Sequence, residues 1–183
     1  MEDKNIIRLS KRLALVLRHN PDSIGITLDP AGWVPVEELL AALRAHGTRV
    51  DRPLLERVVA ENNKARYAFD ETGTRIRASQ GHSVSVDLGL AVAEPPETLY
   101  HGTVAAALPA IQREGLRPMR RHAVHLSANR ETAVTVGARR GKPVVLAVAA
   151  AEMVAVGHEF QLSANGVWLT PHVPADYLTV TST

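Results

Sequence analysis

The chain has 183 residues, and 45% of them are hydrophobic, which is enough to build one large or two small globular domains. It contains no cysteine, which excludes disulfides, thiolate metal sites and thiol catalysis. Its 21 basic and 19 acidic residues leave a formal net charge of +2, which permits an anionic partner without requiring one.

An amphipathic helix is predicted at the start of the chain, where apolar residues recur at helical spacing from Ile6 to Val16. Asn20-Pro21 ends this helix, because the residue before a proline disfavours helical geometry. Arg18 and His19 therefore lie side by side where the helix turns into a loop. An arginine fork fits phosphate oxygens and a histidine exchanges a proton near neutral pH, so the pair suggests a phosphate site. The alternative is a surface arginine that favours the negative end of a helix.

Two further helices and a hairpin are predicted before residue 80. The apolar spacing predicts one helix over 35–45 and another that begins near Asp51, a good capping residue. Two short extended runs, 66–69 and 75–77, flank a glycine-containing turn and predict a hairpin. Three helices followed by a hairpin is the element order of a winged helix, a common nucleic-acid-binding module.

The predicted hairpin is basic. Arg66 lies in its first strand, and Arg75 and Arg77 alternate in its second, so those two share one face. Such a hairpin fits contact with a nucleic-acid backbone. A charged strand edge that resists aggregation explains the same residues equally well.

A linker is predicted over residues 86–98, where Glu94-Pro95-Pro96-Glu97 contains a double proline. The second half of the chain then reads as a small mixed α+β lobe. Helical patterns occur around 104–114 and 129–138. The predicted short strands are 99–100, 124–126, 144–148, 160–162, 167–169 and 177–180.

One polar motif, Tyr100-His101-Gly102-Thr103, is predicted where a strand gives way to a helix. A glycine lets a ligand approach the backbone, and the free amides of a helix start favour anions, so a diphosphate would suit this corner. His101 could bind a ribose hydroxyl, with support from Thr103. An ordinary tight turn with a satisfied histidine is the alternative.

A second polar motif follows the strand at 124–126. His125 alternates with Val124 and Leu126 and should face away from them, and Ser127 could cap the next helix. The basic turn 136–143, which is bracketed by glycines, carries three cations within four residues and could clamp a phosphate, or simply be a solvated basic loop. The eight histidines show no metal-site spacing, so we expect no metal.

Taken in order, these segments resemble the RNA 2′-phosphotransferase family of the KptA type, and they cover nearly the whole chain. The matching segments are Leu17-Arg18-His19, Gly32-Trp33-Val34, Asn62-Asn63-Lys64 with Arg66-Tyr67, Ile76-Arg77-Ala78 with Gln80-Gly81-His82-Ser83, Tyr100-His101-Gly102-Thr103, Val124-His125-Leu126-Ser127, Val136-Gly137 with Arg139 and Gly141-Lys142-Pro143, and Val167-Trp168-Leu169-Thr170. The resemblance implies an N-terminal winged-helix RNA-binding lobe over 1–85, the linker 86–98, and a C-terminal ADP-ribosyltransferase-like, NAD-binding lobe over 99–183.

The resemblance also implies a reaction, in which an internal 2′-phosphate is removed from RNA, as at a tRNA splice junction, by transfer to NAD. The RNA phosphate first displaces nicotinamide, and the ribose 2″-hydroxyl then attacks the phosphorus. The products are 2′-hydroxyl RNA and ADP-ribose 1″,2″-cyclic phosphate. An alternative keeps the fold but has the enzyme ADP-ribosylate a terminal phosphate on RNA or DNA. A third possibility is a regulator without catalytic activity.

The family pattern implies roles for individual residues. Arg18, Arg66 and Arg139 would bind the 2′-phosphate, and His19 would contact it and donate a proton to the departing RNA oxygen. The spacing Val-Gly-x-Arg favours Arg139 over its neighbour Arg140. The implied NAD-binding residues are His101, Gly102, Thr103, His125, Leu126 and Ser127. Because no apolar run is long enough to cross a bilayer and no leader-like segment is evident, we expect a cytoplasmic protein. The resemblance implies RNA and NAD as partners, and we expect a monomer.

Overall fold

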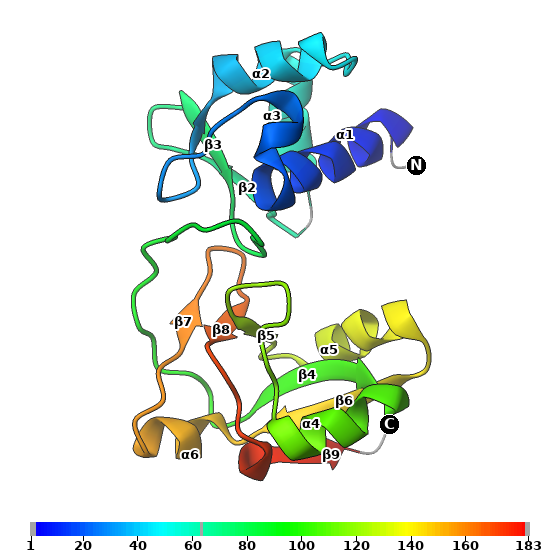
Figure 1. Ribbon diagram of the computed structural model, residues 1–183, viewed down its shortest axis with the longest axis vertical. Coiled ribbons are helices and arrows are strands. Elements are labelled where there is room, and N and C mark those ends of the chain that lie inside the picture. The colour runs from blue at the N-terminus through cyan, green and yellow to red at the C-terminus, as the bar shows by residue number, and fades with distance from the viewer. Residues whose placement is uncertain (1–2, 63, 182–183) are drawn as a thin grey trace. The chain divides into compact units, whose positions relative to one another are not determined.

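The computed structural model describes residues 3–62 and 64–181, and Asn63, which is part of one matching segment, lies outside the described residues. The chain divides into two compact units, Met1–Gly89 and Leu90–Thr183, each with its own hydrophobic core (Figure 1). Both units contain helices and strands, which confirms the predicted α+β class. Over the described ranges, no helix has both the length and the apolar composition needed to span a membrane.

The first helix of the N-terminal unit changes its winding before it ends. α1 (Lys4–Ala14) continues as a π-helix over Leu15–His19, and the amide of Asn20 donates to the Leu15 carbonyl at 2.8 Å. The predicted stop at Asn20-Pro21 is confirmed, and a short 3₁₀ helix (Pro21–Ile24) follows. A π-turn inside a helix is rare and often lies at a functional site.

The other predicted helices of this unit are also present. α2 spans Val36–Ala45, and α3 spans Arg52–Glu61. The Asp51 carboxylate accepts a hydrogen bond from the Leu54 amide at 2.9 Å, which confirms it as the cap of α3. The prediction placed Pro35 inside α2, but it lies just before the helix, as the last residue of the short strand β1 (Val34–Pro35).

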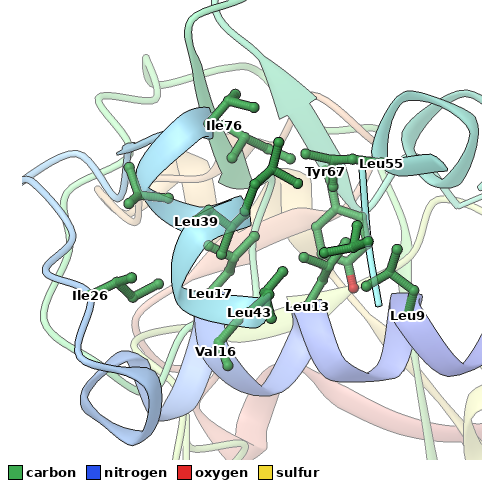
Figure 2. Close-up of a cluster of buried hydrophobic side chains, with 14 of the residues drawn as sticks. Leu9, Leu13, Val16, Leu17, Ile26, Leu39, Leu43, Leu55, Tyr67 and Ile76 are labelled. Carbon is green, nitrogen blue, oxygen red and sulfur yellow. The ribbon is translucent and has the colours of Figure 1, made fainter. Parts of the chain in front are cut away.

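The hairpin of the N-terminal unit is antiparallel, as predicted, and joins β2 (Tyr67–Phe69) to β3 (Arg75–Ala78). β1 adds to the other edge of β3, so the sheet order is β1-β3-β2. The helices and this sheet enclose a core of aliphatic side chains (Figure 2). Tyr67 is buried among them, and its hydroxyl donates to the Ser10 carbonyl of α1 at 2.5 Å.

The C-terminal unit contains two three-stranded antiparallel sheets, with orders β4-β6-β9 and β5-β8-β7. All six predicted strands are present. The strands are β4 (Leu99–Val104), β5 (Val124–Leu126), β6 (Pro143–Val148), β7 (Gln161–Leu162), β8 (Trp168–Thr170) and β9 (Leu178–Thr181). The helices are α4 (Leu108–Glu114), α5 (Arg130–Gly137) and α6 (Ala150–Ala155), with 3₁₀ turns at Ala105–Ala107, Ala138–Arg140 and Ala175–Tyr177.

Two glycines let α5 approach β4 closely (Figure 1). A Cβ on Gly102 would overlap the carbonyl oxygen of Ala133 and would lie 2.8 Å from the Gly137 amide nitrogen. A Cβ on Gly137 would lie 2.9 Å from the carbonyl oxygen of Thr103. The strand and the helix therefore contact through bare backbone at this point.

The segment between β3 and β4 contacts the C-terminal unit before β4 begins. Val92 forms a β-bridge with Gln161, and the Ala93 amide donates to the Phe160 carbonyl at 2.8 Å. The boundary between the units, at residues 89 and 90, lies within the predicted linker segment 86–98.

Candidate functional site

Arg18 and His19 are the last two residues of the π-helix, where the buried Val16 and Leu17 anchor the turn in the core. Arg18 is partly buried and His19 is exposed. The ring of His19 is held by a 2.9 Å hydrogen bond between its Nδ1 atom and Ser83 Oγ. The sequence prediction that both residues lie at a helix end is confirmed.

The loop after β3 fixes this helix end. The amides of Ser83 and Val84 donate to the Arg18 carbonyl at 2.8 and 3.3 Å, and Ser83 Oγ lies 3.4 Å from the same oxygen. Gly81 has φ +90°, a conformation that side chains rarely adopt, and a Cβ there would lie 3.5 Å from Cζ of Arg18. Gly81 therefore packs against the guanidinium face, and Ser83 holds both the backbone and the neighbouring ring.

Arg66 belongs to the same part of the N-terminal unit. Its carbonyl accepts a hydrogen bond from the Ser79 amide at 2.8 Å, at the start of the loop that reaches Ser83. Burial raises the pKa of the Tyr67 hydroxyl, and the hydrogen bond to Ser10 and the charges of Arg18 and Arg66 oppose that rise. Both guanidinium groups thus lie near enough to act on one buried tyrosine.

The two arginines of β3 have structural partners. Arg75 forms ion pairs with Asp70 at 2.9 Å and Asp29 at 3.5 Å, and its hydrogen bond lowers the pKa of Asp70 to about 2. Arg77 lies over the Trp33 ring at 4.4 Å, and Arg75 lies over the same ring at 5.5 Å. The predicted shared face is confirmed, and both side chains contact other residues of the N-terminal unit.

In the C-terminal unit, His101 lies inside β4 rather than at a helix start. The sequence prediction ended this strand at residue 100, but β4 continues to Val104, so the free helix amides expected next to His101 are absent there. The Nδ1 atom of His101 donates to the His125 carbonyl at 3.1 Å. Burial lowers the pKa of His101, and the charges of Arg140 and Arg121 lower it further, while the bond to the carbonyl opposes them.

Gly102 has a structural requirement that the sequence did not reveal. We expected its missing side chain to admit a ligand, but α5 occupies that side, as the overlap with Ala133 shows. Thr103 is buried. The roles of both residues in binding NAD stay predictions.

The His125 motif lies on β5 with its side chains on alternate faces, as predicted. Val124 and Leu126 are buried in the core and His125 is partly exposed. Ser127 does not cap α5. Its backbone exchanges two hydrogen bonds with Tyr100, at 2.8 and 2.9 Å. Asn129 is the cap, because its side chain accepts hydrogen bonds from the first amides of the helix.

Arg121 joins this group of residues, and sequence reasoning missed it. Its Nη1 atom lies 2.8 Å from His125 Nδ1. Burial lowers the pKa of Arg121, and the charges of Arg139 and Arg140 lower it further, so the charges of these two residues act on Arg121. Within the described part of the chain, no carboxylate forms an ion pair with any of the three. The sequence signal for Arg121 was a second pair of adjacent arginines, Arg120 and Arg121, which shortly precedes His125 on its predicted strand.

The arrangement in the C-terminal unit suits an anionic ligand. Three guanidinium groups without an acidic partner provide positive charge, and a partly buried histidine whose pKa is lowered provides hydrogen-bonding capacity beside them. Among the described residues, no group of three or more histidines or carboxylates could hold a metal ion.

Comparison with known proteins extends these observations to the whole chain. A family model described as "RNA 2'-phosphotransferase, Tpt1 / KptA family" matches residues 4–172. A Streptomyces coelicolor protein named probable RNA 2'-phosphotransferase is 59% identical over 178 residues, which make up 97% of each chain. Proteins of the same name from Agrobacterium fabrum and Burkholderia pseudomallei are 56% and 53% identical, and the matches cover 93% or more of each chain.

Proposed function

Because the chain belongs to the RNA 2′-phosphotransferase, Tpt1/KptA, family, we propose that it removes an internal 2′-phosphate from RNA by transferring the phosphate to NAD. The observation that carries the proposal is the Arg18–His19 pair, which the Ser83 loop holds at the end of the first helix near Arg66. Two arginines and a histidine supply the charge and the proton that phosphoryl transfer needs.

The proposed lobes are supported by the order of the elements. The N-terminal unit runs α1, β1, α2, α3, β2, β3, with a sheet of order β1-β3-β2. Helices followed by a small antiparallel hairpin are typical of a winged helix. We therefore propose that the N-terminal unit is a winged helix and that it binds the RNA. We assign an ADP-ribosyltransferase-like fold and NAD binding to the C-terminal unit.

The first proposed step joins the RNA phosphate to the nicotinamide riboside. An oxygen of the 2′-phosphate attacks the anomeric carbon, and the bond from that carbon to nicotinamide breaks. Because the transition state resembles an oxocarbenium ion, the main task of the protein is to hold the phosphate in line. We assign this task to Arg18, Arg66 and Arg139.

The second proposed step transfers the phosphoryl group. The ribose 2″-hydroxyl attacks phosphorus, loses its proton, and the bond between phosphorus and the RNA 2′-oxygen breaks. The same three arginines would stabilise charge on the equatorial oxygens, and His19 would protonate the departing 2′-oxygen. The products are 2′-hydroxyl RNA and ADP-ribose 1″,2″-cyclic phosphate.

The dinucleotide would be held by residues of the C-terminal unit, which are His101, Gly102, Thr103, His125, Leu126 and Ser127. His101 supports this assignment, since its Nδ1 proton is engaged by the His125 carbonyl and its pKa is lowered, so that Nε2 of the neutral ring presents a lone pair. A lone pair of this kind can accept a hydrogen bond from a ribose hydroxyl. The unpaired guanidinium charges nearby fit a diphosphate.

The test is incubation with an oligonucleotide that carries one internal 2′-phosphate, with and without NAD, while nicotinamide release and phosphate loss are followed. We expect both only when NAD is present. Arg18→Ala, His19→Ala, Arg66→Ala and Arg139→Ala should each lower the rate by about 100-fold or more. Arg49→Ala removes an exposed cation of the N-terminal unit and should act like the wild type. Normal turnover in any two of the four variants would contradict the assignment.

A further inference from the structure

α1 has an exposed basic face. Lys4, Arg8 and Lys11 are exposed and lie three or four residues apart, so they share one side of the helix, which we call the basic face of α1. The apolar side of the helix, which includes Leu9 and Leu13, is buried in the core of the N-terminal unit (Figure 2). The basic face is therefore the side of α1 that a partner can reach.

Carboxylates do not balance the charge of this face. Four of the 11 residues of α1 are basic and none is acidic. The carboxylate that caps the helix, Asp3, accepts a hydrogen bond from the Asn5 amide and lies 3.9 Å from Arg57 of α3. Across the residues that the structure describes, the three cations of the basic face form no ion pair.

The basic face does not serve the stability of the helix. α3, in the same unit, has two arginine–glutamate pairs four residues apart, at 2.9 and 3.1 Å. On α1 the same spacing places like charges next to each other, at Lys4 and Arg8 and again at Arg8 and Lys11, and such pairs destabilise a helix. Lys4 also lies in the first turn, where the helix dipole disfavours a cation. This arrangement is typical of a binding surface.

The basic face leads along the helix towards the Arg18–His19 pair. Leu15, which is 41% exposed, follows Lys11 by four residues, and the exposed His19 follows Leu15 by four more. At about 1.5 Å per residue, Lys4 lies about 20 Å from His19 along the helix axis. That length matches several stacked nucleotides, at about 3.4 Å each. An RNA strand whose 2′-phosphate binds at the Arg18–His19 pair can therefore continue over α1.

We propose that the basic face of α1 binds the sugar–phosphate backbone of the RNA that flanks the 2′-phosphorylated nucleotide. The inference rests on the proposed function for its substrate, and it adds a surface outside the residues assigned to the reaction. A membrane is a poorer match for this face, because an amphipathic helix binds a membrane by inserting its apolar side, and the apolar side of α1 lies in the core.

Two double variants and a control test the proposal. The charge-removing variant, Arg8→Gln with Lys11→Gln, keeps residues of good helix propensity, so α1 should stay folded. The charge-keeping variant is Arg8→Lys with Lys11→Arg. The matched control is Arg49→Gln with Arg113→Gln, which removes the same charge from two exposed arginines outside α1.

The first measurement is the binding of an RNA without a 2′-phosphate, about 12 nucleotides long, by fluorescence anisotropy in the absence of NAD. At low salt the charge-removing variant should bind about tenfold more weakly than the wild type. Its plot of log K against log salt should be shallower by about 1.4, because each phosphate of a single strand that is neutralised contributes about 0.7. The charge-keeping variant and the control should bind like the wild type.

The second measurement compares a 2′-phosphorylated dinucleotide with an RNA of about 12 nucleotides that contains the same junction. The dinucleotide reaches the Arg18–His19 pair but has no flanking strand to lie on α1. In the charge-removing variant, kcat/KM for the longer RNA should therefore fall about tenfold. The value for the dinucleotide and KM for NAD should stay unchanged.

Several outcomes overturn the inference. One is RNA binding in the charge-removing variant that is as strong and as salt-dependent as in the wild type. Another is an equal loss for both substrates, which would locate the effect at the reaction site, and a third is an equal loss in the control, which would reduce it to net charge. Binding of phosphatidylserine vesicles but not of RNA through Arg8 and Lys11 would assign the face to a membrane.

The first measurement also separates this inference from the proposed function, because it needs neither NAD nor turnover. A wild type that does not remove the 2′-phosphate would contradict the proposed function. Weaker, less salt-dependent RNA binding by the charge-removing variant would still support the basic face of α1 as an RNA-binding surface, and unchanged binding would refute it.

Discussion

His19 is exposed, and the hydroxyl group of Ser83 contacts its ring. Ser83 Oγ is 2.9 Å from Nδ1 of His19, and the Ser83 amide separately holds the Arg18 carbonyl. Ser83→Ala removes the first contact, together with the 3.4 Å approach of Oγ to the Arg18 carbonyl, and leaves the second. Since a ring that turns freely spends less time aimed at its target, we expect kcat for phosphate removal to fall about tenfold.

The control for this prediction is Ser85→Ala, which removes a hydroxyl from an exposed serine two residues further along the same loop. Steady-state kinetics should show a lower kcat for Ser83→Ala only, and Ser83→Thr should recover most of it. Equal kcat values for Ser83→Ala and the wild type would show that Ser83 does not position His19.

His101 should remain neutral at pH 7. Burial, Arg140 and Arg121 lower its pKa below the usual 6.5, because each disfavours the charged ring. Below pH 6.5 the unfolded chain binds a proton that the folded protein does not, so this histidine stabilises the fold above pH 6.5 and the contribution is lost as the pH falls towards the folded pKa.

An NMR titration of the His101 ring checks this prediction. We expect a midpoint below 6.5 in the wild type and a higher midpoint in Arg121→Met, which removes one of the charges. In His101→Gln, the free energy of unfolding should fall less than in the wild type as the pH is lowered below 6.5. A wild-type midpoint above 6.5 would mean that burial and the neighbouring arginines do not dominate.

Gly102 is one of the two glycines that allow the contact between β4 and α5. Gly102→Ala would drive a Cβ into the Ala133 carbonyl, and neither backbone can move without disturbing its own hydrogen bonds. We expect the C-terminal unit to lose at least about 2 kcal/mol of unfolding free energy, measured by chemical denaturation.

Gly25→Ala provides the comparison for this prediction. Gly25 has φ +72° and open space where a Cβ would lie. The substitution should therefore lower the free energy of unfolding only through backbone strain, by about 1 kcal/mol. If Gly102→Ala were no more destabilising than Gly25→Ala, the close approach of α5 would not be the reason for this glycine.

Local signals explain which elements could be predicted. α1, α2 and α3 have regular apolar stripes and clear start or stop residues, and the hairpin has a turn between two short runs. α6 has no such stripe, because only Ala150 and Met153 are buried, and it was missed. The only signal was Gly157, which follows the helix with φ +100°.

The errors in β4 and α5 came from tertiary context. Gly102 in the middle of β4 resembles the end of a strand, and the reason for it, the backbone of α5, is about thirty residues away in the sequence. Ser127 and Asn129 are both good caps, and the pairing of Ser127 with Tyr100 decides between them. Neither contact can be inferred from neighbouring residues.

The same distinction applies to the candidate site. A helix stop was enough to locate Arg18 and His19. Ser83, which holds them, is 64 residues away from His19, so only the fold reveals it. Arg121 is close to His125 in the sequence, but their contact depends on the loop before β5, where Met119 has φ +58°, and no sequence pattern predicts that loop geometry.

At the scale of the whole molecule, the arginines that contribute to the net charge of +2 differ in whether they pair with a carboxylate. Arg52, Arg57 and Arg75 form ion pairs with carboxylates of the N-terminal unit. In the described part of the C-terminal unit, Arg121, Arg139 and Arg140 have no such pairs. The distribution of charge rather than its sum therefore indicates where anionic groups bind.

The central claim is that a phosphate leaves RNA and becomes attached to the ribose of NAD. The most direct measurement follows a radiolabelled internal 2′-phosphate on an oligonucleotide incubated with the protein and NAD. We predict that the label passes through an ADP-ribosylated RNA and ends in ADP-ribose 1″,2″-cyclic phosphate, with nicotinamide released in equal amount. Recovery of the label as inorganic phosphate without NAD, or its permanent retention on ADP-ribosylated RNA, would contradict the claim.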